Sequence, residues 1–144
     1  MQLTRYTDYS LRVLIYLAVH EEGLATIDEI SDAYGISKAH LTKIVHQLGL
    51  AGYLETVRGR GGGLRLARPP EKIRIGDVVR QTEEMSLVEC FDPKTSHCRI
   101  EPVCGLQAVL REALQAFLRT LDGYTLADLV QRRRQPLVRL FAAS

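Results

Sequence analysis

All three cysteines of the 144-residue chain lie in one short stretch, residues 89–106, with the sequence ECFDPKTSHCRIEPVCGL. Cys90, Cys98 and Cys104 are separated by seven and then five residues, a spacing that differs from the Cys-x₂-Cys pairs of zinc ribbons. Soft thiolates suit zinc and iron–sulfur clusters, and such sites usually take four protein ligands. The residues alone therefore call for a fourth, non-cysteine ligand. They leave open an iron–sulfur cluster, a zinc site, a thiol switch and inert thiols.

The apolar repeat after this stretch predicts how the last cysteine is held. Apolar residues recur every three or four positions from about residue 103 to residue 121, which predicts a long amphipathic helix. Because proline is favoured at the first position of a helix, Pro102 places Cys104 in the first turn of this helix. There, free backbone amides and the helix dipole favour a thiolate.

In the first fifty-two residues the pattern predicts three helices, and a short connector helix follows around residues 75–81. The first covers residues 7–20 and is buried over much of its surface. Thr26 and Glu29 have the capping-box spacing that begins a second helix, and Gly35 ends it. Ser37 can cap a third helix. Two short helices joined by a glycine-containing turn predict a helix-turn-helix.

Residues 53–67, YLETVRGRGGGLRLA, predict a β-hairpin with a glycine-rich tip, which directly after a helix-turn-helix is a wing. Residues 36–75 carry eight Lys and Arg against two Glu, whereas acidic residues dominate from 76 to 92. Taken alone, this basic patch is equally consistent with a solvated surface. Together with the motif it indicates nucleic acid as the partner.

The second helix of a helix-turn-helix enters the major groove of DNA, and arginines on a narrow tip can reach the minor groove. The predicted DNA-binding residues are Ser37, Lys38, His40, Thr42, Lys43, Arg58, Arg60, Gly61 and Gly62. One such unit reads only a few base pairs. The wide apolar face of the long helix therefore suggests pairing with a second copy, which would match a palindromic double-stranded operator.

The predicted fold class is mainly α with a small β-hairpin: a winged helix-turn-helix plus a long dimerisation helix. We expect residues 1–70 to form the DNA-binding domain and residues 71–104 to form a connector helix and the cysteine loop. Residues 105–144 would contain the dimerisation helix and a short C-terminal helix near residues 126–131.

Composition limits the class of protein. The chain is 46% hydrophobic and 25% charged, with a net charge of +2, as expected for a globular protein. No apolar run approaches the roughly 20 residues that cross a bilayer, and the first residues lack a signal-peptide pattern. We therefore expect a cytoplasmic protein with no membrane partner, where clustered cysteines bind metal or sense redox state. No Ser/His/Asp grouping or phosphate-binding loop is present, so we expect no enzymatic activity.

Five stretches, taken in order, resemble the NsrR/IscR family of bacterial iron–sulfur winged-helix regulators. They are LTRYTDYSLR, VRGRGGGLRLA, IRIGDVVR, the cysteine loop and LDGYTLADLV. The closer match is to the nitric-oxide-sensing repressors of that family. The resemblance implies a homodimer that carries a [4Fe–4S] cluster, or alternatively a [2Fe–2S] cluster, and releases operator DNA when nitric oxide nitrosylates it.

The resemblance also implies the fourth ligand: Asp8, reaching in from the partner subunit, with Arg12 close to the cluster. The residues alone favour a different role for Asp8, as an acid stabilised at a helix start and paired with Arg12. His97 and Asp92 are rival ligands. IscR-like members use a histidine where this chain has Gln107. The alternative functions are a zinc- or thiol-based redox regulator and an iron–sulfur carrier without regulatory DNA binding.

Overall fold

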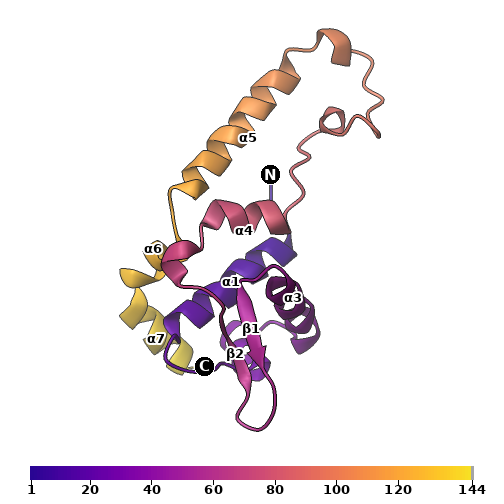
Figure 1. Cartoon of the computed structure of the whole chain (residues 1–144). Coiled ribbons are helices and arrows are strands. Elements are labelled where there is room, and N and C mark those ends of the chain that lie inside the picture. The colour runs from indigo at the N-terminus through magenta and orange to yellow at the C-terminus, as the bar shows by residue number, and fades with distance from the viewer. Residues whose placement is uncertain (144) are drawn as a thin grey trace.

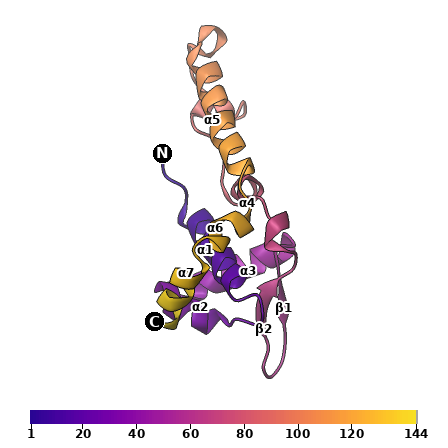
Figure 2. The same ribbon diagram turned by 90° about the vertical axis from the view of Figure 1, so that its left-hand side faces the viewer.

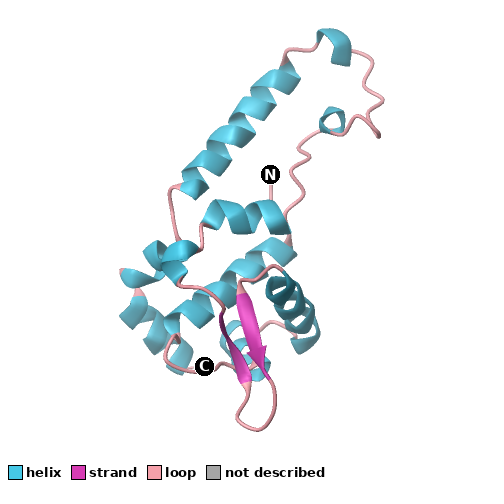
Figure 3. Cartoon of the chain, in the orientation of Figure 1, coloured by secondary structure: helices cyan, strands magenta, loops and turns pink. Residues whose placement is uncertain are grey.

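Within residues 1–143, which the computed structural model describes, the chain folds as seven α-helices and one small antiparallel sheet (Figure 3). The predicted fold class, mainly α with a small β-hairpin, is confirmed. Among these residues, no helix is both long and apolar enough to cross a lipid bilayer. The elements are α1 (Arg5–Val19), α2 (Ile27–Tyr34), α3 (Lys38–Leu50), β1 (Leu54–Val57), β2 (Gly63–Leu66), η1 (Pro70–Lys72), α4 (Ile75–Thr82), η2 (Glu89–Phe91), η3 (Glu101–Val103), α5 (Leu106–Asp122), α6 (Leu126–Gln131) and α7 (Arg134–Ala142), where η marks a 3-10 turn.

Helix α1 is the centre of the fold, because helices α3, α4 and α6 and strand β2 all pack on it (Figure 1). Val13, Leu14 and Ala18 are fully buried, as the sequence pattern predicts. Burial of each larger apolar side chain contributes roughly 1.5–3 kcal/mol. The helix begins at Arg5 because the side chain of Thr4 caps its first turn.

Helices α2 and α3 form the predicted helix-turn-helix. Thr26 and Glu29 make the reciprocal hydrogen bonds of a capping box at the start of α2. Gly35 ends that helix with a φ of 65°, a left-handed conformation that glycine adopts without strain. The Ser31 hydroxyl donates to the Ile36 carbonyl oxygen at 2.7 Å and closes the turn between the two helices.

Strands β1 and β2 form the predicted wing. They pair antiparallel, with Leu54 opposite Leu66. The hairpin is fixed to the body where the Leu64 N–H donates to the Ala25 carbonyl at 2.7 Å and the Leu64 carbonyl accepts the Ala25 N–H at 3.0 Å. Residues 58–62 connect the strands and form the tip of the wing.

We call residues 84–122 the arm, because the loop after α4 and helix α5 extend together away from the body (Figures 1 and 2). At its base, Arg80 of α4 donates two hydrogen bonds to the Asp122 carboxylate, at 2.6 and 2.7 Å. Gly76 lies so close to Asp122 that a Cβ there would overlap its carboxylate. In this fully described helix, Leu118 is the only buried residue of α5.

Helix α5 begins at Leu106, and this corrects the predicted position of Cys104. Pro102 belongs to the separate turn η3, and Cys104 follows that turn with an extended backbone (φ −83°, ψ 116°). Gly105 then occupies the N-cap position of α5. Cys104 therefore precedes the helix and does not lie in its first turn.

Helix α7 is a second correction, because the sequence analysis predicted no helix after residue 131. Pro136 lies in the first turn of α7, where its missing N–H costs no helical hydrogen bond. Near the end of the helix, the ring of Phe141 packs on Tyr16 of α1, with 4.9 Å between the ring centroids.

Candidate nucleic-acid interface and cysteine loop

The outer face of α3 carries the side chains predicted to contact DNA. Lys38, His40 and Lys43 are exposed. The Ser37 hydroxyl caps the helix by accepting the His40 N–H at 3.3 Å, and the Thr42 hydroxyl donates to the Lys38 carbonyl at 2.7 Å. Because these two hydroxyls are engaged within the helix, the basic side chains are the stronger candidates for DNA contact.

The tip of the wing presents two further cations. Arg58 and Arg60 are exposed, and neither forms an ion pair within residues 1–143. Gly59 and Gly61 shape the tip with φ values of 100° and 73°. Gly62 lies so close to the backbone carbonyls of the turn that a Cβ there would overlap them. Strand β1 packs on α3, so the tip and the recognition helix belong to one surface.

Part of the predicted basic patch is neutralised within the fold. The Lys38 ammonium lies 3.0 Å from an Asp28 carboxylate oxygen, and Arg65 is paired with Glu55 across the hairpin. The Arg68 guanidinium donates hydrogen bonds to two backbone carbonyls just after α3, at 3.1 and 3.3 Å. The charge available to a ligand is therefore smaller than the sequence count suggests.

The three cysteines lie on the arm. Cys90 lies in η2, Cys98 in the loop that follows, and Cys104 between η3 and α5. All three are half-buried free thiols. Within residues 1–143, no three His, Cys, Asp or Glu side chains lie close enough together to hold a metal ion. One chain thus places the cysteines on a single loop but does not gather them around one point.

Of the two rival ligands, Asp92 uses its carboxylate in a structural role in this loop, whereas His97 uses only its backbone N–H. The Asp92 carboxylate accepts the N–H of Lys94 at 3.0 Å and the hydroxyl of Thr95 at 3.2 Å, which caps a turn. The backbone N–H of His97 donates to Glu89 at 3.5 Å.

The chemistry of the cysteine loop fits an iron–sulfur cluster. Three soft thiol donors on one segment are free of disulfide bonds, and thiolates are the donors that hold such clusters. The Gln107 side-chain amide donates to the Cys90 carbonyl at 2.6 Å and ties the loop to α5. The Gln107 side chain thus braces the backbone of the first cysteine.

Asp8 lies on α1, in the body of the molecule. Its carboxylate accepts two hydrogen bonds from Arg12, at 2.7 and 3.0 Å, as the residue-based alternative predicts. The Asp8 side chain is nevertheless 44% exposed. Tyr34 fixes the backbone at this point, because its hydroxyl donates to the Arg12 carbonyl at 2.9 Å. Burial raises the pKa of Tyr34, so this hydroxyl remains a donor.

The sequence analysis missed Glu83, which connects the start of α1 to the end of α4. One Glu83 carboxylate oxygen accepts the Thr4 N–H at 2.9 Å, the Thr4 hydroxyl at 3.0 Å and the Thr7 hydroxyl at 2.6 Å. Burial alone would raise the pKa of Glu83, but these hydrogen bonds outweigh burial and hold it below its ordinary value. No local pattern signals this contact, because its partners lie almost eighty residues apart.

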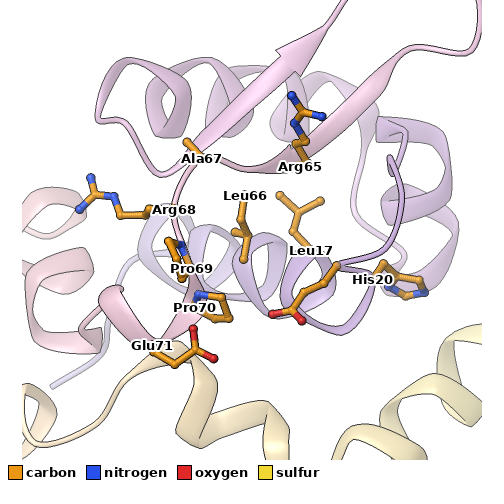
Figure 4. Close-up of a pocket in the computed structure, with 10 residues that line it drawn as sticks. Leu17, His20, Arg65, Leu66, Ala67, Arg68, Pro69, Pro70 and Glu71 are labelled. Atoms are coloured by element: carbon orange, nitrogen blue, oxygen red, sulfur yellow. The ribbon is translucent and has the colours of Figure 1, made fainter.

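A hollow of about 480 Å³ opens where β2 and the following prolines approach the end of α1 (Figure 4). Leu66 and Leu17 lie near its centre, with Arg68 and His20 at opposite ends. Its lining, all within the described residues, contains no serine, threonine or cysteine that could act as a nucleophile. The hollow marks the joint between wing and body.

Comparison with known proteins agrees with this architecture. Residues 3–132 match the Rrf2 family, described as iron-dependent transcriptional regulators. The chain is 57% identical over 135 residues to the HTH-type transcriptional regulator NsrR of Bacillus subtilis, which covers 92% of each chain. It is also 57% identical over 135 residues to NsrR of Geobacillus kaustophilus, again covering 92% of each chain.

Two solved structures share the fold. T. potens IscR has a TM-score of 0.75 and 26% sequence identity, covering 92% of this chain and 88% of that protein. CymR, the global cysteine regulator of B. subtilis, has a TM-score of 0.71 and 28% identity, covering 92% of this chain and 98% of that protein.

Proposed function

The chain belongs to the Rrf2 family of DNA-binding transcriptional regulators, which are not enzymes, and we propose that it is a homodimeric, cytoplasmic repressor that senses nitric oxide through an iron–sulfur cluster. Two kinds of evidence support the proposal: the chemistry of the cysteine loop and the similarity to NsrR of B. subtilis. The observation that carries it is the position of three free thiols on one loop beside the exposed apolar residues at the start of α5.

The uncovered face of α5 supports the homodimer. Leu106 and Val109 are 59% and 60% exposed, and neighbouring Ile100 and Val103 are 60% and 88% exposed. A soluble protein rarely leaves so many large apolar side chains together in water, and such a patch marks an interface. A second copy of α5 offers the same surface, so a two-fold contact would cover both faces at once.

In the proposed dimer, Cys90, Cys98 and Cys104 would hold the cluster, and Asp8 of the partner subunit would supply the fourth ligand. When bound, a [4Fe–4S] or [2Fe–2S] cluster supplies iron that nitric oxide can attack. A carboxylate is a harder and weaker ligand for such iron than a thiolate, so the Asp8 position is the more easily vacated one. Arg12 gives Asp8 an alternative partner when it is not a ligand.

The route from the cluster to DNA passes through α1. Asp8 lies on α1, and α1 packs directly on the recognition helix α3. Loss of the Asp8 ligand would release the body of one subunit from the arm of the other. The recognition helices would then no longer be held at the spacing of the palindromic operator.

Anaerobic purification followed by DNA-binding measurements tests the proposal. We expect a brown protein with iron and sulfide in equal amounts. Its affinity for a duplex selected from random sequence should fall at least about tenfold on addition of nitric oxide, as for an ordinary allosteric coupling. Fluorescence anisotropy measures the affinity, and absorption spectra measure the cluster.

Asp8→Ala and Asp92→Ala form a matched pair in that experiment. Asp8→Ala should leave the protein folded and dimeric but make the cluster labile or change the response to nitric oxide. Asp92→Ala removes the cap of a turn in the cysteine loop but no proposed ligand, so its effect on the cluster and on the response should be much smaller than that of Asp8→Ala. A colourless, zinc-loaded protein with the same DNA affinity in the presence and absence of nitric oxide would refute the proposal and favour a zinc regulator.

A further inference from the structure

A small cavity of about 250 Å³ lies between the first turns of α1 and the outer part of α3. It adjoins the surface predicted to contact DNA but includes side chains that the sequence analysis did not assign to that surface. Its lining residues are Arg5, Tyr6, Tyr9, His40, Lys43 and Ile44.

The cavity carries positive charge that the fold does not neutralise. Arg5 reaches it from α1 and Lys43 from α3, and no acidic side chain lines it. Within residues 1–143, neither cation forms an ion pair, in contrast to Lys38 and Arg12, which are paired with acids. Two unneutralised cations on opposite walls of one small cavity favour an anionic ligand.

The remaining lining suits a ligand with both polar and apolar parts. Tyr6 and Tyr9 are half-buried and bring phenol hydroxyls and ring faces to the cavity. The Tyr9 ring is fixed between two neighbours, with 6.4 Å to the centroid of the His40 ring and 5.5 Å to the Arg12 guanidinium carbon. Ile44 adds an apolar surface. A phosphodiester joined to its deoxyribose has this combination of an anion and a less polar ring.

We propose that this cavity binds a phosphodiester of the DNA backbone, with Arg5 and Lys43 on either side of the same phosphate. The inference rests on the proposed DNA-binding function and extends the interface from α3 and the wing to the start of α1. In helix-turn-helix proteins an earlier helix crosses the backbone while the recognition helix enters the major groove. A contact of this kind positions α3 in the groove without reading sequence.

The salt dependence of DNA binding tests this assignment. The logarithm of the binding constant falls linearly with the logarithm of salt concentration, with a slope of about −0.9 for each neutralised phosphate. Because the phosphate is held between two cations and needs both, Arg5→Ala should lose the whole contact and reduce the magnitude of the slope by about 0.9 for each bound subunit. The reduction should be equal on a selected duplex and on an unrelated duplex. Anisotropy titrations of the whole protein at several salt concentrations measure both slopes.

Arg139→Ala is the matched control, because it removes the same charge from an exposed position on α7, on the other side of the body from α3 (Figure 1). It should leave the slope unchanged. Lys43→Ala should also reduce the magnitude of the slope. The double variant Arg5→Ala/Lys43→Ala should reduce it by no more than the loss of one phosphate contact. Arg5→Gln and Lys43→Gln keep long side chains and repeat the test with smaller effects on helix stability.

An unchanged slope in Arg5→Ala, an additive loss in the double variant, or a loss on the selected duplex alone would overturn the assignment. These results are distinct from failure of the proposed function. If the slopes change as expected while nitric oxide has no effect, the phosphate cavity stands and the sensor proposal fails. If nitric oxide acts as proposed while the slopes stay constant, the sensor stands and the cavity assignment fails.

Discussion

At the level of single residues, Glu83 connects the two parts of the molecule on which the proposed function depends. Its carboxylate joins the first turn of α1, which bears Asp8, to the end of α4, where the arm begins. One oxygen accepts three hydrogen bonds from Thr4 and Thr7, and Thr7 is fully buried. Hydrogen bonds to a charged group are stronger than neutral ones, so this contact fixes where the arm leaves the body.

Removing this carboxylate should destabilise the fold. We expect Glu83→Ala to lower the free energy of unfolding by on the order of 1–2 kcal/mol, because the Thr7 hydroxyl loses its acceptor. Denaturant unfolding measures the change. Glu84→Ala alters the neighbouring, exposed glutamate and should be nearly neutral. Equal destabilisation by the two substitutions would contradict this role for Glu83.

Because the pKa of Glu83 is lowered, the contribution of its carboxylate to folding stability should depend on pH. Because hydrogen bonding holds its pKa below the ordinary value of about 4.3, the ionised form stabilises the folded state above that pH. This stabilisation is lost as the pH falls through the lowered pKa. The stability difference between the wild type and Glu83→Gln should therefore be largest at neutral pH and disappear in acid. A difference that stays constant into strong acid would contradict the linkage.

Residue types and spacing predicted which cations lie at the surface, but not the state of each side chain. The sequence correctly identified the exposed cations of α3 and the wing tip. It could not reveal that Asp28 pairs with Lys38, because that contact crosses the turn between two helices. It left the pairing of Asp8 with Arg12 as one of two alternatives, and the structure contains that ion pair within one chain. A pair within one helix follows from i,i+4 spacing, whereas a pair between two elements depends on how those elements pack.

At the level of elements, the wing depends on glycine at the point where its chain reverses. A Cβ at Gly62 would overlap the carbonyl oxygens of Val57 and Gly59. The Gly62 N–H also donates to the Gly59 carbonyl at 3.0 Å and closes the turn. The tip cannot accept a side chain here without moving Arg58 and Arg60.

Gly62→Ala should therefore weaken DNA binding and destabilise the hairpin, while the hydrophobic core of the body stays intact. We expect a loss of about 1–3 kcal/mol in stability, confined to the hairpin, because overpacking shifts the local backbone. DNA affinity should fall several-fold as the two arginines move. Thermal unfolding and anisotropy measure the two effects.

Gly23→Ala is the control for this substitution, because an added Cβ there meets nothing within 4 Å. It should leave both measurements close to wild type. Unchanged DNA affinity in Gly62→Ala would mean that the shape of the tip does not matter for binding.

Elements with strong local sequence signals were predicted correctly. Element boundaries that depend on contacts between distant residues, or on an unexpected backbone conformation, were not. The capping box at Thr26 and the left-handed Gly35 set the boundaries of α2 as predicted. The start of α5 was wrong, because Cys104 takes an extended backbone that separates Pro102 from the helix. Helix α7 was missed because its clearest anchor is the packing of Phe141 on Tyr16, a contact between the two ends of the chain.

At the level of the whole molecule, the body and the arm differ in how far each buries its apolar side chains within one chain. The body buries its core within one chain around α1, as the fully buried Val13 and Leu14 indicate. The arm instead leaves Leu106 and Val109 in solvent and meets the body through α4. Nearer the body, Leu118 is buried and Leu114 and Phe117 pack on the core, so within residues 1–143 only the outer end of the apolar face is left uncovered.

Introducing charge on this face tests the dimer that the proposed function requires. Leu106→Glu combined with Val109→Glu should produce a folded monomer, because both side chains are exposed in the single chain and burying carboxylates in an apolar contact is costly. Sedimentation velocity measures the mass. Leu140→Glu places one such carboxylate at a position on α7 that is 67% exposed, and it should leave the dimer intact.

Monomerisation should also weaken both proposed activities, DNA binding and cluster binding, at the same time. Two linked DNA-binding units gain affinity for a palindrome through effective concentration, so the monomer should bind it roughly 10²- to 10⁴-fold more weakly. If Asp8 of the partner subunit completes the cluster site, the monomer should also lose its cluster more quickly in air. A charged variant that remains a dimer would place the interface elsewhere. A monomer that retains a stable cluster would show that the fourth ligand comes from the same chain.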